Sequence, residues 1–165
     1  WAKGPVSYLF LAEELDEWKE LETDEERRDF IQWFWDRRDD DLRDRRHPFK
    51  EGFYTRVATG NRRFSGFPRG WKSDRGRVWI ILGRPDSLRT DFATELEIWT
   101  YDTYGGILRV SSSMGEMQVA FIRAGVGNRE IYGGIGPGAW PPYLITAFRI
   151  VNRALIENPS LKRGQ

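Results

Sequence analysis

Four charged side chains near the middle of the chain are the residues whose types and spacing could do chemistry. Asp74 is followed by Arg75 and Arg77, and Asp86 lies beyond the next apolar run. Carboxylates beside guanidinium groups can bind a small ligand or take part in acid–base catalysis. The apolar run 78–82 is typical of a buried strand, which would hold the two carboxylates about 30 Å apart. We therefore expect a structural role for these residues, with a ligand site as the alternative.

The other candidates for a reactive centre lack the partners that they would need. The chain has no cysteine and one histidine, His47, which excludes thiol catalysis, cysteine-ligated metals and any site with two imidazoles. We interpret His47 as a loop residue, with a general-base role as the alternative. Residues 39–41 are three carboxylates, but consecutive residues on a helix point in different directions, so we expect no metal ion there.

Two further motifs are incomplete. The serines at 111–113 have no plausible base nearby, and no Gly-x-Ser-x-Gly elbow is present. The glycine-rich stretch 133–138 has no Lys-Ser/Thr ending, and its proline lacks an N–H group that a phosphate cradle would use. The sequence therefore predicts no catalytic residue, no metal site and no cofactor.

The composition is that of one folded domain. A length of 165 residues predicts a single domain over 1–165, and 8 Trp, 10 Phe and 6 Tyr supply much of its core. No apolar run approaches the roughly 20 residues of a membrane span, so we expect no transmembrane segment. The absence of cysteine fits an oxidising compartment.

The formal net charge of +1 conceals a strong asymmetry along the chain. Residues 1–45 contain 15 acidic and 8 basic side chains, whereas residues 46–90 contain 3 acidic and 11 basic ones. Arginines interleaved with aromatic rings are also typical of a surface that binds single-stranded nucleic acid. We favour the alternative that the two segments face each other within the fold, because their net charges nearly cancel. We accordingly expect no nucleic-acid partner.

Apolar spacing places helices first and strands later, which predicts an α+β domain. In this domain the N-terminal helices and a C-terminal helix pack on an antiparallel sheet of about four strands. Helices are expected over 5–22, from Thr23 to about 45 with a Thr23/Glu26 capping box, over 49–60 and over 143–157. Strands are expected over 78–82, 95–101, 107–112 and 117–123, with a hairpin turn at 104–106. The domain thus divides into a helical part (5–60), a signature loop and sheet (66–123), a Gly/Pro-rich arm (124–142) and the final helix.

The stretch Gly70-Trp71-Lys72-Ser73-Asp74, followed by an apolar run and by Gly83-Arg84-Pro85-Asp86, resembles the signature of the GWxTD-domain family. Residues 30–39, with their Phe-Trp and Arg-Asp pieces, and residues 97–101 look like two further segments of that family. Ser73 stands where the family has Thr and retains the hydroxyl. A charged run to Arg46 replaces the family's Arg-Asp-Pro turn. The resemblance covers about residues 25–122.

The signature also makes sense as architecture. The glycines permit close backbone approach, the hydroxyl and carboxylate form a turn, and the proline fixes the turn that follows. The structural residues on this interpretation are Gly70, Trp71, Ser73, Asp74, Arg75, Gly76, Arg77, Gly83, Pro85 and Asp86. The tryptophans expected in the core are Trp33, Trp71 and Trp79.

The resemblance implies an exported bacterial protein without an assigned reaction. We expect a non-enzymatic interaction domain, periplasmic or on the outer surface and peripheral on a membrane. As an accessory or structural subunit it would dock by protein–protein contacts, for example on a photosynthetic or secretion complex. Contact candidates, chosen because aromatic residues are frequent interface hot spots, are Trp1, Tyr8, Trp140, Pro141 and Tyr143. The alternatives are a ligand-binding or enzymatic domain using Asp74, Arg75, Arg77 and Asp86, and a nucleic-acid-binding domain using 46–90.

Overall fold

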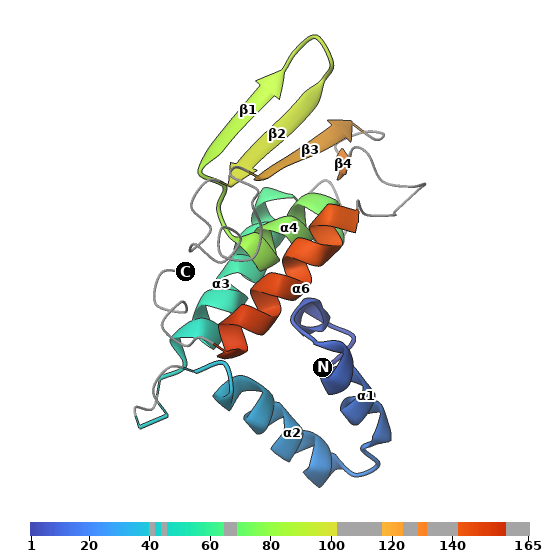
Figure 1. Cartoon of the computed structure of the whole chain (residues 1–165), viewed down its shortest axis with the longest axis vertical. Coiled ribbons are helices and arrows are strands. Elements are labelled where there is room, and N and C mark those ends of the chain that lie inside the picture. The colour runs from blue at the N-terminus through green and yellow to red at the C-terminus, as the bar shows by residue number, and fades with distance from the viewer. Residues whose placement is uncertain are drawn as a thin grey trace.

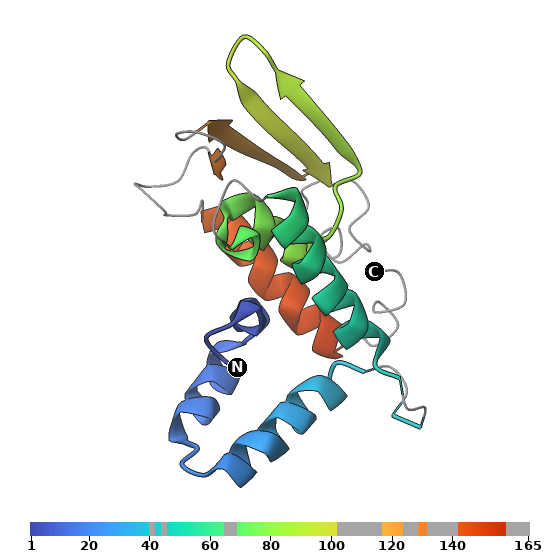
Figure 2. The same cartoon turned by 180° about the vertical axis from the view of Figure 1, so that it is seen from behind.

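The helices and the sheet occupy different ends of the molecule. The computed structural model describes residues 1–39, 42–43, 46–64, 69–101, 117–123, 129–131 and 142–157. Its helices are η1 (Pro5–Tyr8), α1 (Ala12–Glu20), α2 (Asp24–Asp36), α3 (Pro48–Arg63), η2 (Gly70–Lys72), α4 (Asp74–Leu82) and α6 (Pro142–Glu157). Its strands are β1 (Ser87–Asp91), β2 (Leu96–Tyr101), β3 (Met117–Arg123) and β4 (Arg129–Ile131). Figure 1 shows the sheet above α3, α4 and α6, with α1 and α2 at the far end, and Figure 2 shows the same order from behind.

The described strands form one antiparallel sheet in the order β1-β2-β3-β4. Trp99 of β2 lies opposite Leu88 of β1 and Val119 of β3, and Tyr101 lies opposite Met117. Alternate residues of β3, Met117, Val119 and Phe121, are buried, and so are the last three residues of β2, so this end of the sheet closes the core above the helices. The expected α+β class and antiparallel sheet are confirmed.

The apolar run 78–82 is a helix, so the strand that we predicted there is wrong. Ser73 caps the N-terminus of α4, because its hydroxyl accepts the N–H of Gly76 at 3.0 Å. All five residues of the run are buried. A fully buried run has neither the two-residue nor the 3.6-residue alternation, so its pattern does not distinguish a strand from a helix. Gly83, at φ 78°, ends the helix.

The N-terminal helices are shorter than expected. The predicted helix over 5–22 is divided into η1 and α1, because the backbone at Leu11 is extended and its N–H is bonded to Glu14. The Thr23/Glu26 capping box is confirmed. Its helix, however, ends at Asp36 rather than near 45.

Asp39 and His47 lie closer together than a helix continuing through both would allow. The carboxylate Oδ2 of Asp39 lies 2.6 Å from Nδ1 of His47. A continuous helix would place these residues about 12 Å apart along its axis. A helix from Thr23 to about 45 is therefore incompatible with the position of Asp39 relative to His47.

Four of the remaining predicted elements are present close to their expected positions. The expected helices over 49–60 and 143–157 and the strands over 95–101 and 117–123 are present with shifts of up to three residues at their ends. The strands β1 and β4 were not predicted, because β1 is short and mostly polar and β4 lies in the expected Gly/Pro-rich arm. The expected strand over 107–112 and the turn at 104–106 lie outside the described residues.

The three tryptophans expected in the core differ in how far they are buried. Trp79 is buried and Trp71 is half-buried as expected, but Trp33 is 39% exposed, so placing it in the core was wrong. On α2, Phe30 and Phe34 are buried, whereas Trp33 lies at the edge of this buried stripe, with the guanidinium of Arg37 4.6 Å from the centre of its ring.

No helix in the described part of the chain is long and apolar enough to cross a membrane.

Candidate functional site

The signature residues form a close backbone crossing between α3 and the start of α4. A Cβ atom on Gly70 would lie 2.5 Å from the carbonyl oxygen of Gly60 in α3. A Cβ atom on Gly76 would overlap the carbonyl oxygen of Gly70. Both positions therefore require glycine because no side chain fits between the backbones. The glycine spacing of the signature thus sets the distance between two helices.

Ser73 fixes the turn at this crossing. Its buried hydroxyl donates to the carbonyl oxygen of Gly70 at 2.7 Å and accepts the N–H of Gly76. The backbone N–H of Trp71 donates to Oδ1 of Asn61 in α3 at 3.0 Å. The hydroxyl that serine shares with threonine is therefore the feature that this position uses.

Asp74 and Arg77 lie close to Tyr8 of η1. The Tyr8 hydroxyl donates to the carbonyl oxygen of Trp71 at 3.1 Å, and the Arg77 guanidinium lies 5.0 Å from the centre of the Tyr8 ring. Burial raises the pKa of Tyr8 to about 12, while Arg77 lowers this pKa and Asp74 raises it. Tyr8 therefore holds its proton at neutral pH and contacts the signature from inside the molecule.

Arg75 points from the same helix to the sheet. Its Nη1 atom lies 3.3 Å from Oε2 of Glu97, and the indole N–H of Trp99 donates to Oε1 of Glu97 at 2.8 Å. The guanidinium also lies 5.0 Å from the centre of the Phe64 ring. Glu97, which the sequence did not single out as a charge partner, thus links α4 to β2.

The other end of α4 holds the rest of the signature. The Tyr101 hydroxyl donates to the carbonyl oxygen of Gly83 at 3.2 Å, and Pro85 is buried. Asp86 is exposed, and its N–H donates to the carbonyl oxygen of Thr100 at 2.9 Å. Because α4 has nine residues, its axis separates Asp74 from this end by about 13 Å rather than by the length of a strand.

The four charged signature residues therefore do not meet in one place. Asp74 and Arg77 lie near Tyr8, Arg75 contacts Glu97, and Asp86 lies beyond the far end of the helix. This arrangement joins η1, α3, α4 and β2, and it agrees with the structural interpretation of the motif.

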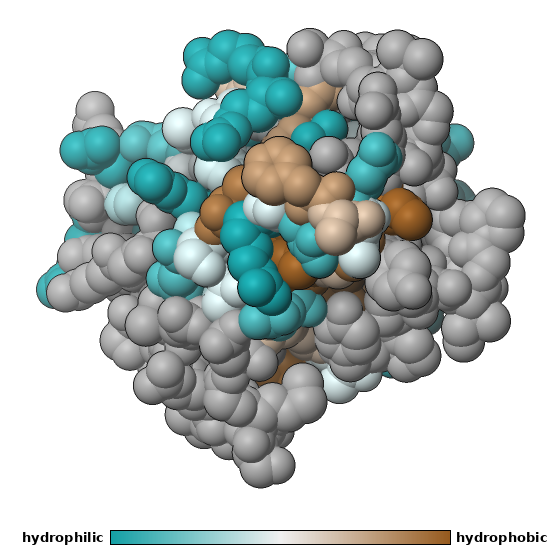
Figure 3. Space-filling model, turned by 90° about the horizontal axis from the view of Figure 1, so that it is seen from above, coloured by the Kyte–Doolittle hydropathy of each residue, from teal (hydrophilic) through white to brown (hydrophobic). Residues whose placement is uncertain are grey.

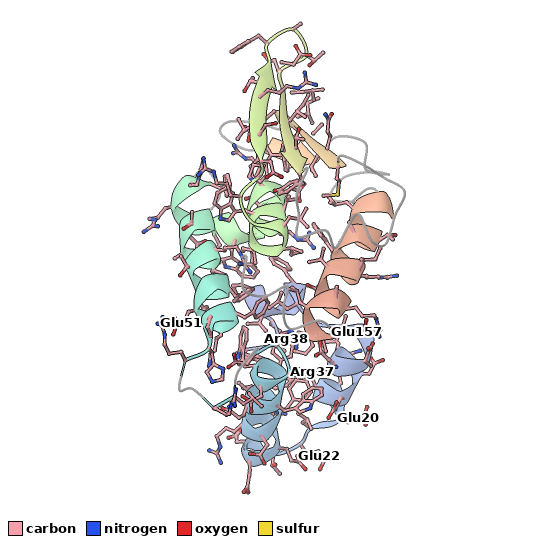
Figure 4. All side chains as sticks on the ribbon, turned by 60° about the vertical axis from the view of Figure 1, so that its left-hand side comes forward. Glu20, Glu22, Arg37, Arg38, Glu51 and Glu157 are labelled. Carbon is pink, nitrogen blue, oxygen red and sulfur yellow. The ribbon has the colours of Figure 1, made fainter. Side chains whose placement is uncertain are left out.

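A buried ion cluster between α1 and α2 was missed by the sequence analysis. Glu14 is 0% exposed and Arg38 is 1% exposed. Both carboxylate oxygens of Glu14 accept from Arg38, at 2.9 and 2.8 Å, and Oε1 also accepts from Arg37 at 3.2 Å. Figure 4 shows Arg37 and Arg38 where α2 approaches the N-terminal elements. Glu14 is one of several acidic residues in this stretch, and the sequence gives no signal that it is the one that is buried.

The rest of the Arg38 guanidinium is paired with the backbone. It donates to the carbonyl oxygens of Phe34 at 2.9 Å and Leu9 at 3.0 Å, and it lies 3.7 Å from the centre of the Phe34 ring. Burial lowers the pKa of Arg38, and its hydrogen bonds to Glu14 oppose that shift. Arg38 thus acts as a clamp that joins η1, α1 and α2.

The described ion pairs correct the picture of two charged segments facing each other. Glu14 pairs with Arg37 and Arg38 of its own segment, and Glu13 pairs with Arg153 of α6 at 2.9 Å. The contact between Asp39 and His47 joins the two segments. The acidic side chains of α1 are therefore paired partly with arginines of the N-terminal segment itself and partly with an arginine of α6.

The aromatic rings of the basic segment are mostly internal. Phe53, Phe64 and Trp79 are buried, and the Arg63 guanidinium covers Trp79 at 4.7 Å. Buried rings cannot stack on nucleic-acid bases. No group of three or more His, Cys, Asp or Glu residues able to hold a metal ion occurs within the described ranges.

Two of the residues expected to contact a partner, Trp1 and Tyr8, pack against other aromatic rings of the domain. Trp1 is 37% exposed, and its ring lies 5.1 Å from that of Phe34 and 5.2 Å from that of Trp18, so it packs on the N-terminal aromatic cluster. Tyr8 is half-buried against Trp71, with 5.7 Å between the ring centres. Trp140, Pro141 and the side chain of Tyr143 lie outside the described residues.

Comparison with known proteins identifies one family. The family model described as GWxTD domain matches residues 3–121. None of the curated proteins and none of the solved structures compared with the chain matches it. The matched range includes the residues of the glycine crossing, the Arg38 clamp and the contact between Arg75 and Glu97.

Proposed function

Because the chain belongs to the GWxTD-domain family, we propose that it is a non-enzymatic interaction domain that docks on other protein subunits. The observation that carries the proposal is that charged residues of the matched segment pair with one another inside the fold. Arg38 and Arg75 hold helices and sheet together through Glu14 and Glu97, rather than lining one shared site. Such a framework keeps a surface rigid, which lowers the entropy cost of binding a partner.

The exposed aromatic and aliphatic side chains are the candidates for that surface. Phe92, at the turn between β1 and β2, is 90% exposed, and Leu88 of β1 is 51% exposed. Trp33, on the outer side of α2, is a third. Aromatic side chains dominate the binding energy of protein interfaces, and a fully exposed phenylalanine gains most from burial.

We further propose that the domain works outside the cytoplasm, in the periplasm or on the outer surface. There it would be an accessory or structural subunit of a membrane-embedded assembly, such as a photosynthetic or secretion complex. The family resemblance and the absence of cysteine support this location. A fusion to a reporter that is active only after export tests the location, and activity confined to the cytoplasm contradicts it.

The docking proposal is tested by comparing complexes formed by matched variants. Tagged wild-type protein, Trp33→Ser and Phe92→Ser are each recovered from native membrane fractions, and the co-purified proteins are quantified. We expect a defined set of subunits with the wild type and a several-fold loss with at least one variant. Arg62→Ser, which removes an exposed side chain of α3 that is neither aromatic nor aliphatic, is the control. Recovery of the same proteins in the same amounts by all forms would contradict the proposal.

A further inference from the structure

The strand β1 is an open edge of the described sheet. In the order β1-β2-β3-β4, β1 pairs with β2 on one side only. Its residues from Ser87 to Thr90 are exposed. Figures 1 and 2 show the β1–β2 hairpin projecting beyond the helices, with β1 on the outside. An edge strand presents unpaired N–H and C=O groups to which another strand can add.

The order of side chains along β1 is complementary to itself. Thr90 is preceded by Arg89 and followed by Asp91, and two residues to either side stand Leu88 and Phe92, the latter one residue beyond the end of β1. Reading the strand backwards about Thr90 therefore places a negative charge opposite a positive one and an apolar side chain opposite another. Opposite-charge and apolar pairs directly across an antiparallel ladder are stabilising.

We propose that two copies of this chain pair through β1, antiparallel about a two-fold axis at Thr90, to form one continuous sheet. Arg89 of each copy then faces Asp91 of the other, and Leu88 faces Phe92. Thr90 faces its own counterpart across the axis. This self-association needs no other subunit, but it covers Leu88 and Phe92, which are also candidates for the docking surface proposed above.

Neighbouring registers fit less well. Shifting the axis by one residue, to Arg89, places two guanidinium groups opposite each other, which is destabilising. It also pairs Leu88 with Thr90 and places Phe92 opposite Asp86, so the apolar pair is lost. The register at Thr90 is therefore selected by both charge and apolar contact.

The charges and apolar groups that the proposal uses are accessible. Arg89 is exposed, and Leu88 and Phe92 are among the most exposed apolar residues of the described chain. A hydrogen bond from Thr94 and the N–H of Ala93 hold the pKa of Asp91 below its usual range, so this carboxylate is ionised at neutral pH. Seen from above, the sheet end carries apolar and hydrophilic side chains next to each other (Figure 3).

The interface is small. With the axis at Thr90, three residues of β1, Arg89–Asp91, face strand residues of the other copy, with Leu88 facing Phe92 at each end. This pairing buries less than the roughly 1,000 Å² of a typical stable complex. We therefore expect a dimer that dissociates on dilution. Charged residues on an edge strand can also serve to prevent pairing. The experiment must distinguish these two roles of Arg89.

The natural sequence contains no cysteine, so a single introduced cysteine reports the register directly. In the proposed dimer the two residues at position 90 lie directly opposite, within the Cα separation of about 4.4–6.8 Å that a disulfide requires. Leu88→Cys places its two thiols four residues apart along the ladder. Gln118→Cys, exposed on β3, is the collision control. Under mild oxidation we expect Thr90→Cys to form the covalent dimer about tenfold faster than either control.

A second measurement uses no cysteine. Sedimentation equilibrium of the wild type over a wide concentration range should show a monomer–dimer equilibrium. Arg89→Asp places like charges opposite each other and should weaken the dimer about tenfold. Arg84→Asp makes the same charge change at an exposed residue outside β1 and should leave the equilibrium unchanged.

Three results would overturn the proposal. They are equal cross-linking rates at positions 88, 90 and 118, faster cross-linking of Arg89→Cys than of Thr90→Cys, and a wild-type protein that stays monomeric at every concentration. Docking to other subunits is tested separately by Trp33→Ser, because Trp33 lies on α2 and takes no part in the proposed pairing of β1.

Discussion

The guanidinium of Arg38 and the carboxylate of Glu14 form a doubly hydrogen-bonded ion pair in the interior, with donor–acceptor distances of 2.9 and 2.8 Å. Removing two charges from water costs several kcal/mol per ion, so such a pair adds little net stability compared with apolar residues. Its importance lies in mutual dependence, because either charge left alone is buried without compensation. The pair therefore ties α1 to α2 in one arrangement.

Glu14→Gln should destabilise the fold strongly. It leaves the buried Arg38 without its counter-charge, and breaking a buried pair in this way costs about 3–5 kcal/mol. Glu13→Gln removes the adjacent but exposed partner of Arg153 and should change the free energy of unfolding little, because solvent screens this pair. Urea unfolding of the two variants measures the difference. Equal unfolding midpoints would show that the Glu14 carboxylate is not buried as described.

Glycine-to-alanine changes at the helix crossing should have opposite signs. Gly76→Ala places a methyl group on the carbonyl oxygen of Gly70, and overpacking of this kind typically costs about 1–3 kcal/mol. Gly60→Ala meets its nearest atom, Cα of Gly76, at 3.9 Å, which is an ordinary contact. Because Gly60 lies inside α3, alanine there should stabilise by about 0.5–1 kcal/mol.

Thermal unfolding of the two alanine variants beside the wild type provides the test. The prediction concerns sign as well as size, so a lower Tm for Gly60→Ala than for Gly76→Ala would contradict the crossing geometry.

The hydroxyl of Ser73 should be required, but serine itself should not. Ser73→Ala removes the N-cap of α4 and the bond to the carbonyl oxygen of Gly70, and loss of a cap costs about 1 kcal/mol. Ser73→Thr restores the family's residue and keeps both bonds, so its free energy of unfolding should be close to that of the wild type. A threonine variant as unstable as the alanine variant would show that the added methyl group does not fit.

Local signals in the sequence predicted the parts of the fold that short-range chemistry controls. The Thr23/Glu26 box, the helix from Pro142 and the strand from Met117 need information only from nearby residues. The glycines of the signature were correctly taken as points of close approach, although the approaching backbone, at Gly60, was not identified.

The failures have a common physical cause, which is burial decided by distant residues. The run 78–82 is covered on all sides, so it lacks the polar face that would reveal a helical period. Glu14 resembles its acidic neighbours in sequence, and only Arg38, 24 residues away, makes it an internal residue. The contacts that the charged signature residues make with Tyr8 and Glu97 could not be predicted, because pairing across elements is set by the fold.

The Tyr8 hydroxyl should lose its proton at a higher pH than an ordinary tyrosine. The free energy of unfolding should therefore depend on pH in the alkaline range. Its pKa is raised to about 12 in the folded protein, above the usual value of about 10 in an unfolded chain. The contribution of Tyr8 to stability is therefore complete below pH 10 and is lost as the pH rises through 12. The free energy of unfolding of Tyr8→Phe, which cannot ionise at this position, should decline less between these pH values than that of the wild type. Parallel declines would show that the Tyr8 hydroxyl is not shielded by its contact with Trp71.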